Sequence, residues 1–203
     1  MKKLYAVTVL CVLAVAGAAN SAPTLEKADL ESAQKYLEST RKGVEEATKG
    51  LSEAQWNFKP APDRWSVAEV LEHITVAEDY LRGFVENQVL KAPAAPDRDV
   101  KKIDEMVLAM IPDRSHKFQA PEPLRPTNKF VTPAETLKHF LESRAKTEAL
   151  LKDTPDLRDH AMESPLNGQK LDAYEWILFI AAHSDRHTKQ IKEVEADPNF
   201  PKK

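Results

Sequence analysis

Four long stretches of the chain repeat apolar residues three, four or seven positions apart, the spacing of one face of a helix. In the first stretch this spacing predicts a helix from about residue 25 to residue 52, with a charged opposite face. Its apolar positions are Leu30, Ala33, Leu37, Val44, Ala47 and Leu51. The other stretches predict helices from residue 66 to about 90, from residue 132 onwards, and from residue 172 to about 196.

The starts of the later helices carry recognisable N-terminal signals. Ser66 and Glu69 form a capping-box pattern, in which each side chain satisfies a backbone amide of the other residue. The third helix combines a cap at Thr132, a proline at the first helical position and a box glutamate at Glu135. The fourth opens at Asp172. These signals fix where three of the four helices begin.

The pattern predicts an all-α protein. Sustained alternation of apolar and polar residues is absent from the sequence, and five glycines are few for a chain of hairpins. Four principal helices of this length favour a four-helix bundle. Its second and third helices are joined by a long crossover, residues 91–131, which contains a possible short helix over 100–111 and a proline-bearing stretch. Such a segment is either a lid over one end of the bundle or a plain connection.

The first 21 residues have the features of an export signal. Lys2 and Lys3 precede an uncharged run that ends in small residues, with possible cleavage after Ala18 or Ser21. The alternative is an uncleaved membrane anchor, for which the run is short. We therefore expect a signal peptide over residues 1–21, a single domain over residues 22–203, and a mature protein in the periplasm or outside the cell, with no membrane segment left.

Removal of the signal changes the chemistry available to the protein. The formal net charge of −3 becomes −5 when Lys2 and Lys3 are lost, and the single cysteine, Cys11, is lost with them. The mature protein then has neither a disulfide nor a thiol nucleophile nor a sulfur ligand for a metal. The mildly acidic balance gives no basic footprint, so we expect no nucleic-acid partner.

Two histidines lie on the apolar face of the fourth helix, among isoleucines and Trp176. His183 and His187 are four residues apart, which places them one turn apart on the same face. A buried imidazole needs a partner, and two rings at this spacing can bind one ion at about 2.0–2.1 Å per bond. Six histidines in 203 residues give about 0.2 such pairs by chance, so the pair alone is a weak motif.

A third ligand is available on the second helix. His73 lies at the edge of the apolar stripe of that helix, and a bundle can bring the second and fourth helices together. We expect the remaining histidines, His116, His139 and His160, to lie at the surface. Zincin, di-iron and c-type haem motifs are all absent from the sequence.

The segments from Trp65 to His73 and from His183 to Ile191 resemble the two signature helices of the DinB-like superfamily. The specific content of the resemblance is the three histidines together with Trp65, Arg186 and Gln190. It implies a four-helix bundle in which His73, His183 and His187 bind a divalent ion, commonly zinc or nickel. Some relatives are thiol-dependent transferases or isomerases. The export signal departs from that pattern, because the thiols concerned are mainly cytosolic.

A three-histidine site with an open position is typical of catalytic zinc. The first hypothesis is therefore a metal-dependent hydrolase or transferase acting on a small molecule, with Glu69, four residues before His73, as acid or base. Glu69 has the alternative role of capping Ser66. Trp65 and Trp176 either line a pocket or belong to the core.

Asp185 is expected to point away from the site. Arg186 and Glu72 are expected on solvated faces, unless Glu72 orients a ligand. A second hypothesis is a metal-binding or ligand-binding bundle of the cell envelope without turnover. A third is a structural bundle with hydrogen-bonded core histidines. Pairing of two copies through the first helix is possible, so a homodimer stays open. The sequence names neither the substrate nor the metal.

Overall fold

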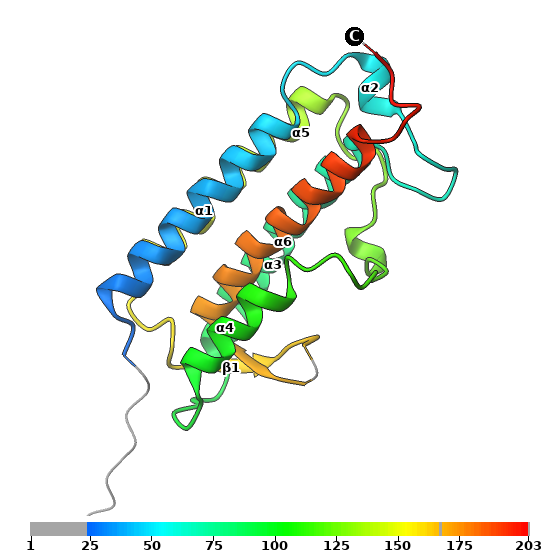
Figure 1. Cartoon of the computed structure of the whole chain (residues 1–203). Helices are drawn as coiled ribbons and strands as arrows, with labels where there is room; N and C mark the ends of the chain where they lie inside the picture. Colours follow the sequence, from blue (N-terminus) through cyan, green and yellow to red (C-terminus); the bar gives the residue numbers. More distant parts are fainter. Residues whose placement is uncertain (1–23, 167, 203) are drawn as a thin grey trace, which may run out of the picture.

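A computed structural model describes residues 24–166 and 168–202 of the chain (Figure 1). The predicted signal peptide over residues 1–21 lies outside the described residues. Four long helices form the body of the molecule: α1 (Lys27–Ala47), α3 (Val67–Asn87), α5 (Pro133–Asp153) and α6 (Ala173–Glu195). The smaller elements are α2 (Glu53–Asn57), η1 (Val89–Lys91), α4 (Val100–Met110), η2 (Glu122–Leu124), β1 (Ala161–Glu163) and β2 (Lys170–Asp172).

The long helices pack as a four-helix bundle. α1 and α3 each pack against both α5 and α6 and therefore lie at diagonally opposite corners. Figure 1 shows that α1 and α6 run in one direction and α3 and α5 in the other. The all-α prediction and the bundle are confirmed.

The long crossover follows from these directions. Because α3 and α5 run parallel, the chain that leaves the end of α3 must return along the whole bundle before α5 can begin (Figure 1). On its way α4 packs against α6 and η2 packs against α3. The predicted helix over 100–111 is confirmed, with its end at Met110. The crossover thus covers the pair of helices that carries the three histidines.

The predicted N-terminal capping boxes are confirmed by reciprocal hydrogen bonds at the starts of α3, α5 and α6. The Ser66 amide donates to a Glu69 carboxylate oxygen at 2.8 Å, and the Glu69 amide donates to the Ser66 hydroxyl at 3.3 Å. Thr132 with Glu135, and Asp172 with Glu175, form the same reciprocal pairs at the starts of α5 and α6. Local hydrogen bonding at the N-cap therefore fixes where these three helices start.

Other boundaries differ from the prediction. The first helix ends at Ala47 rather than residue 52, because the chain turns through Gly50 at a φ of 68°. Ser52 then starts the separate helix α2. The second helix ends at Asn87, before η1. A short antiparallel hairpin of β1 and β2 precedes α6, which the pattern did not predict because its strands have only three residues each.

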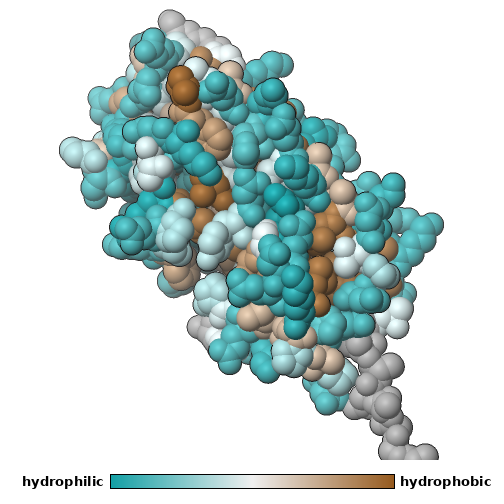
Figure 2. All heavy atoms as spheres, turned by 180° about the vertical axis from the view of Figure 1, so that it is seen from behind, coloured by the Kyte–Doolittle hydropathy of each residue, from teal (hydrophilic) through white to brown (hydrophobic). Residues whose placement is uncertain are grey.

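The surface opposite to the view of Figure 1 is largely hydrophilic, with separate apolar bands (Figure 2). None of the helices in the described part of the chain is both long enough and apolar enough to span a bilayer. The apolar core divides into two groups, one toward the start of α6 and one toward its end. On α6, His183 and His187 lie between Ala182 of the first group and Ile191 of the second.

Candidate metal centre

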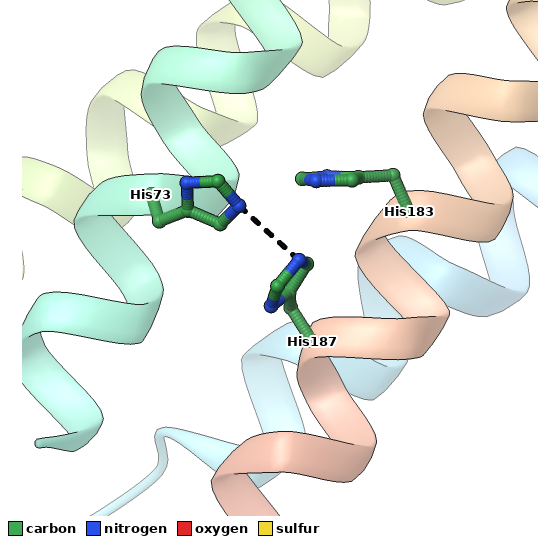
Figure 3. A group of neighbouring side chains, drawn as sticks. All are labelled: His73, His183 and His187. Atoms are coloured by element: carbon green, nitrogen blue, oxygen red, sulfur yellow. Dashed lines mark hydrogen bonds between the residues drawn. The ribbon is translucent and has the colours of Figure 1, made fainter. Parts of the chain in front are cut away.

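The structure brings the three predicted ligands together. His73 projects from α3 toward His183 and His187, which lie one turn apart on α6 (Figure 3). One ligand atom from each ring lies within 4.8 Å of the others. His73 and His187 are buried, with exposed fractions of 3% and 8%. Packing of α3 against α6 thus creates a compact site from residues far apart in the sequence.

Hydrogen bonds select the tautomers of two rings. Nδ1 of His73 lies 2.7 Å from the carbonyl oxygen of Leu124, which can only accept, so His73 carries its proton on Nδ1. Nδ1 of His187 lies 2.8 Å from Oε1 of Gln190, which also accepts from Arg114. His187 therefore carries its proton on Nδ1 as well. In both rings the Nε2 lone pair is left for the interior of the cluster.

The two Nε2 atoms face each other at 3.1 Å (Figure 3). Two lone pairs at this distance repel unless a cation or a proton lies between them. Nitrogens bound to one tetrahedral zinc at about 2.0–2.1 Å per bond are about 3.3 Å apart, close to the observed separation. Within the described residues, His183 has no hydrogen-bond partner, so its ring is available to the same ion. The residues present fit a divalent metal.

Burial keeps these rings neutral. Desolvation lowers the pKa of His73, and it lowers the pKa values of His183 and His187 well below the ordinary value. The neighbouring histidines and Arg186 lower the pKa of His183 further. Because only a neutral imidazole binds a metal, the cluster is ready to do so at neutral pH without first losing protons.

Aromatic rings flank the cluster. The ring centroid of Trp65 lies 4.9 Å from that of His73, and Phe179 stacks on His183 with centroids 6.4 Å apart. Trp176 is buried between Phe84 and Phe179 and belongs to the core. Of the two tryptophans considered from the sequence, only Trp65 contacts a ligand histidine in this way.

Glu69 occupies its capping position. One carboxylate oxygen accepts from the Ser66 amide, and the other lies 2.7 Å from Nζ of Lys59. In the described part of the chain the group of side chains able to hold a metal comprises the three histidines without Glu69. The carboxylate is therefore engaged at the start of α3, and its role as acid or base stays a prediction.

The sequence suggested that Glu72 and Arg186 lie on solvated faces, and this prediction was wrong. Both are buried, with exposed fractions of 5% and 8%. The crossover covers them and satisfies their charges with backbone groups, a contact that helical periodicity cannot reveal. Asp185 forms an ion pair with Lys189 at 3.0 Å and takes no part in the cluster.

The other histidines lie apart from the site. His116 is exposed, as predicted, and His139 is about half exposed and binds Asp79 at 2.6 Å. His160 is half-buried, and its Nδ1 has no hydrogen-bond partner among the described residues. The surface prediction was wrong for His160, because the segment that carries it pairs with Ala94 of the crossover.

Sequence reasoning missed a buried ion pair next to the site. The guanidinium of Arg144 on α5 donates two hydrogen bonds of 2.8 Å to Glu78 on α3, and a third to Ser184 at 2.9 Å. Ser184 lies between the two ligand histidines of α6. The signal was present in the sequence: Glu78 interrupts the apolar stripe four residues after Ile74 and three before Leu81.

Comparison with known proteins agrees with this architecture. The sequence profile of the DinB superfamily matches residues 36–191. The uncharacterized protein YuaE of Bacillus subtilis (strain 168) is 31% identical over 141 residues, which cover 68% of this chain and 82% of YuaE.

Two solved structures share the fold. YfiT from Bacillus subtilis, described as a probable metal-dependent hydrolase with an unusual four-helix bundle topology, aligns with a TM-score of 0.57 at 15% identity, over 88% of this chain and 92% of YfiT. A conserved protein from Enterococcus faecalis aligns with a TM-score of 0.55 at 14% identity, over 81% of this chain and 93% of that one. At these identities the likeness concerns the fold.

Proposed function

Because this chain belongs to the DinB superfamily, we propose that it is a divalent-metal-dependent hydrolase or transferase that acts on a small molecule through His73, His183 and His187. One observation carries the proposal: the Nε2 atoms of His73 and His187 face each other at 3.1 Å while both Nδ1 atoms are engaged elsewhere. That arrangement stabilises a bound cation and is unfavourable without one.

The metal proposed is zinc or nickel. Three neutral imidazoles, of which His73 and His187 are buried and His183 is partly buried, match the preference of both ions for nitrogen ligands. Such an ion, when bound, supplies a Lewis acid that polarises a substrate oxygen and lowers the pKa of a water molecule. The chain itself holds the rings of His73 and His187 in the Nδ1-protonated tautomer, and the rings of Trp65 and Phe179 lie beside His73 and His183.

A binding protein without turnover is the second candidate. One observation favours it: the Glu69 carboxylate is already bound by the Ser66 amide and Lys59. Hydrolysis requires a positioned acid or base, and a carboxylate engaged in a cap must leave that cap to serve as one. In this alternative the protein is a non-catalytic metal-binding or ligand-binding bundle of the cell envelope.

Export, partners and assembly complete the proposal. The basic start and apolar run of the first 21 residues support export to the periplasm or the outside of the cell. The partner is a small-molecule substrate rather than nucleic acid, because the charge balance is mildly acidic. Pairing of two copies is tested by light scattering.

The test is elemental analysis of the mature protein, purified without a histidine tag or chelator. We expect about one equivalent of a transition metal in the wild type and none in the His73→Ala, His183→Ala, His187→Ala variant. No metal in either protein, even after addition of zinc or nickel, would contradict the proposal. Metal-loaded protein is then screened for hydrolysis of small amides and esters, and complete inactivity there favours the binding alternative.

A further inference from the structure

Glu72, the residue before His73, holds one segment of the crossover in place. Its Oε1 accepts from the amide of Thr127 at 2.7 Å and from the amide of Lys129 at 3.2 Å. Asn128 between them has a φ of 60°. Leu124, only three residues before Thr127, supplies the carbonyl that binds Nδ1 of His73. The same short segment is therefore bound by Glu72 and binds His73.

Arg186, the residue before His187, does the same for a second segment. Its guanidinium donates to the carbonyl oxygens of Ile111, Asp113 and His116. Arg114, inside this segment, donates to Oε1 of Gln190 at 3.3 Å and binds Glu193 through two hydrogen bonds of 2.5 and 2.7 Å. Gln190 in turn accepts from Nδ1 of His187.

In both cases the residue that binds the crossover directly precedes a ligand histidine in the sequence, and this arrangement has a geometric cause. Consecutive residues on a helix point about 100° apart, so His73 faces the neighbouring helix while Glu72 faces the crossover. The same holds for His187 and Arg186. Glu72 thus fixes the segment whose Leu124 carbonyl is the acceptor for His73. Arg186 fixes the segment whose Arg114 binds Gln190, the acceptor for His187.

We propose that Glu72 and Gln190 are positioning residues that set the Nδ1-protonated tautomers of His73 and His187, so that docking of the crossover and metal binding stabilise each other. The proposal rests on the metal site proposed above, but its tautomer component does not require the ion. Residues that orient ligand histidines commonly change metal affinity by about 10- to 100-fold when removed. By linkage, if docking of the crossover raises the metal affinity by such a factor, bound metal strengthens docking by the same factor.

The first experiment needs no metal. Nitrogen-15 spectra of the imidazoles in metal-free protein report which ring nitrogen carries the proton. We expect Nδ1-protonated His73 and His187 in the wild type, loss of this preference at His187 in Gln190→Leu, and its recovery in Gln190→Glu, which restores an acceptor oxygen. Glu72→Ala is expected to release His73, whereas Glu86→Ala, at a partly exposed carboxylate on the same helix that pairs with Arg82, leaves both rings unchanged. Unchanged tautomers in Gln190→Leu and Glu72→Ala would overturn the inference.

The second experiment measures the coupling. Zinc affinity is determined by competition with a chromophoric chelator, and amide hydrogen exchange of residues 111–129 is followed with and without zinc. We expect affinity about 10- to 100-fold weaker in Gln190→Leu and Glu72→Ala, and slower exchange of the crossover in zinc-loaded wild type. If the wild type binds no zinc, the proposed metal site is contradicted. The positioning roles of Glu72 and Gln190 are then decided by the tautomer measurement. Zinc binding that is equally tight in all variants contradicts the positioning roles alone.

Discussion

Arg144 and Glu78 form a bidentate ion pair at the centre of the bundle, where their exposed fractions are 0% and 1%. The pair links α3 to α5, and further hydrogen bonds from Arg144 reach the Leu37 carbonyl and Thr40 on α1 and Ser184 on α6. Thr147 also donates to Glu78 at 2.8 Å. All four long helices therefore meet at one satisfied polar network, directly beside the histidine cluster.

Removal of one partner should strongly destabilise the protein. We expect Glu78→Ala to lower the free energy of unfolding by about 3–5 kcal/mol, because the Arg144 charge would be left buried without its carboxylate. Urea denaturation of metal-free protein provides the measurement. Glu38→Ala, which removes an exposed carboxylate paired with Lys42, is the matched control and should lower the free energy of unfolding far less, because water screens a surface pair. Equal losses in the two variants would show that the central network contributes no more than a surface pair.

The helices themselves could be predicted from the sequence because their signals are local. Three starts are marked by capping boxes whose atoms lie within four residues of one another, and the apolar stripes identify the buried faces. The convergence of His73 with His183 and His187 also followed from these stripes. A bundle has few ways to bury two such faces against each other.

The partners of the histidines could not be predicted from the same signals. Glu72 binds the Thr127 amide 55 positions away, and Arg186 binds backbone carbonyls 70 and 75 positions away. A helical pattern states which face is apolar, whereas it carries no information about which irregular segment covers a charged face. Backbone carbonyls and amides, moreover, are the same in every residue and leave no signature in the sequence.

Acid should destabilise the metal-free protein through the histidine cluster. In the folded state burial holds the pKa values of His183 and His187 well below the ordinary value, so the unfolded chain binds more protons below about pH 6.5. Stability is therefore fully present above that pH and falls as pH decreases. We expect a loss on the order of 1 kcal/mol per histidine between about pH 7.5 and about pH 5.5.

This pH dependence is measured by urea denaturation in the presence of a chelator. The variant with alanine at His73, His183 and His187 is the control and should lose less stability over the same range. An identical loss in both proteins would assign the acid sensitivity to other groups.

Glu69 provides a test that separates turnover from capping. In Glu69→Gln the amide oxygen can still accept from the Ser66 amide, so stability should change by less than about 1 kcal/mol. If Glu69 acts as acid or base, the turnover found with the metal-loaded protein should fall about 100-fold or more, with metal content unchanged. Steady-state rates and elemental analysis of the same samples give both quantities. Turnover that persists in Glu69→Gln would show that Glu69 only caps α3 and pairs with Lys59, and does not act as acid or base.

Arg186 should control how firmly the crossover lies on the bundle. Its guanidinium binds the carbonyl oxygens of Ile111, Asp113 and His116, whereas the ammonium of a lysine cannot reach all three from one position. A hydrogen bond that involves a charged group contributes about 1.5–3 kcal/mol to stability. A loss of about 1.4 kcal/mol changes an equilibrium constant about tenfold. We therefore expect the open form of this segment to be at least about tenfold more populated in Arg186→Lys than in the wild type.

Limited digestion with trypsin measures this opening, since Arg114 and Lys117 lie within the segment and cleavage there follows the population of the open form. Mass spectrometry identifies the cleaved bond. Lys192→Ala, at an exposed position on α6, is the matched control and should be cut at the wild-type rate. Addition of zinc should slow cleavage of the wild type more than that of Arg186→Lys, because a loosened crossover transmits less of the binding free energy. Equal cleavage of Arg186→Lys and the wild type would mean that the crossover is held by its buried apolar residues, such as Leu124 and Ile111, rather than by this guanidinium.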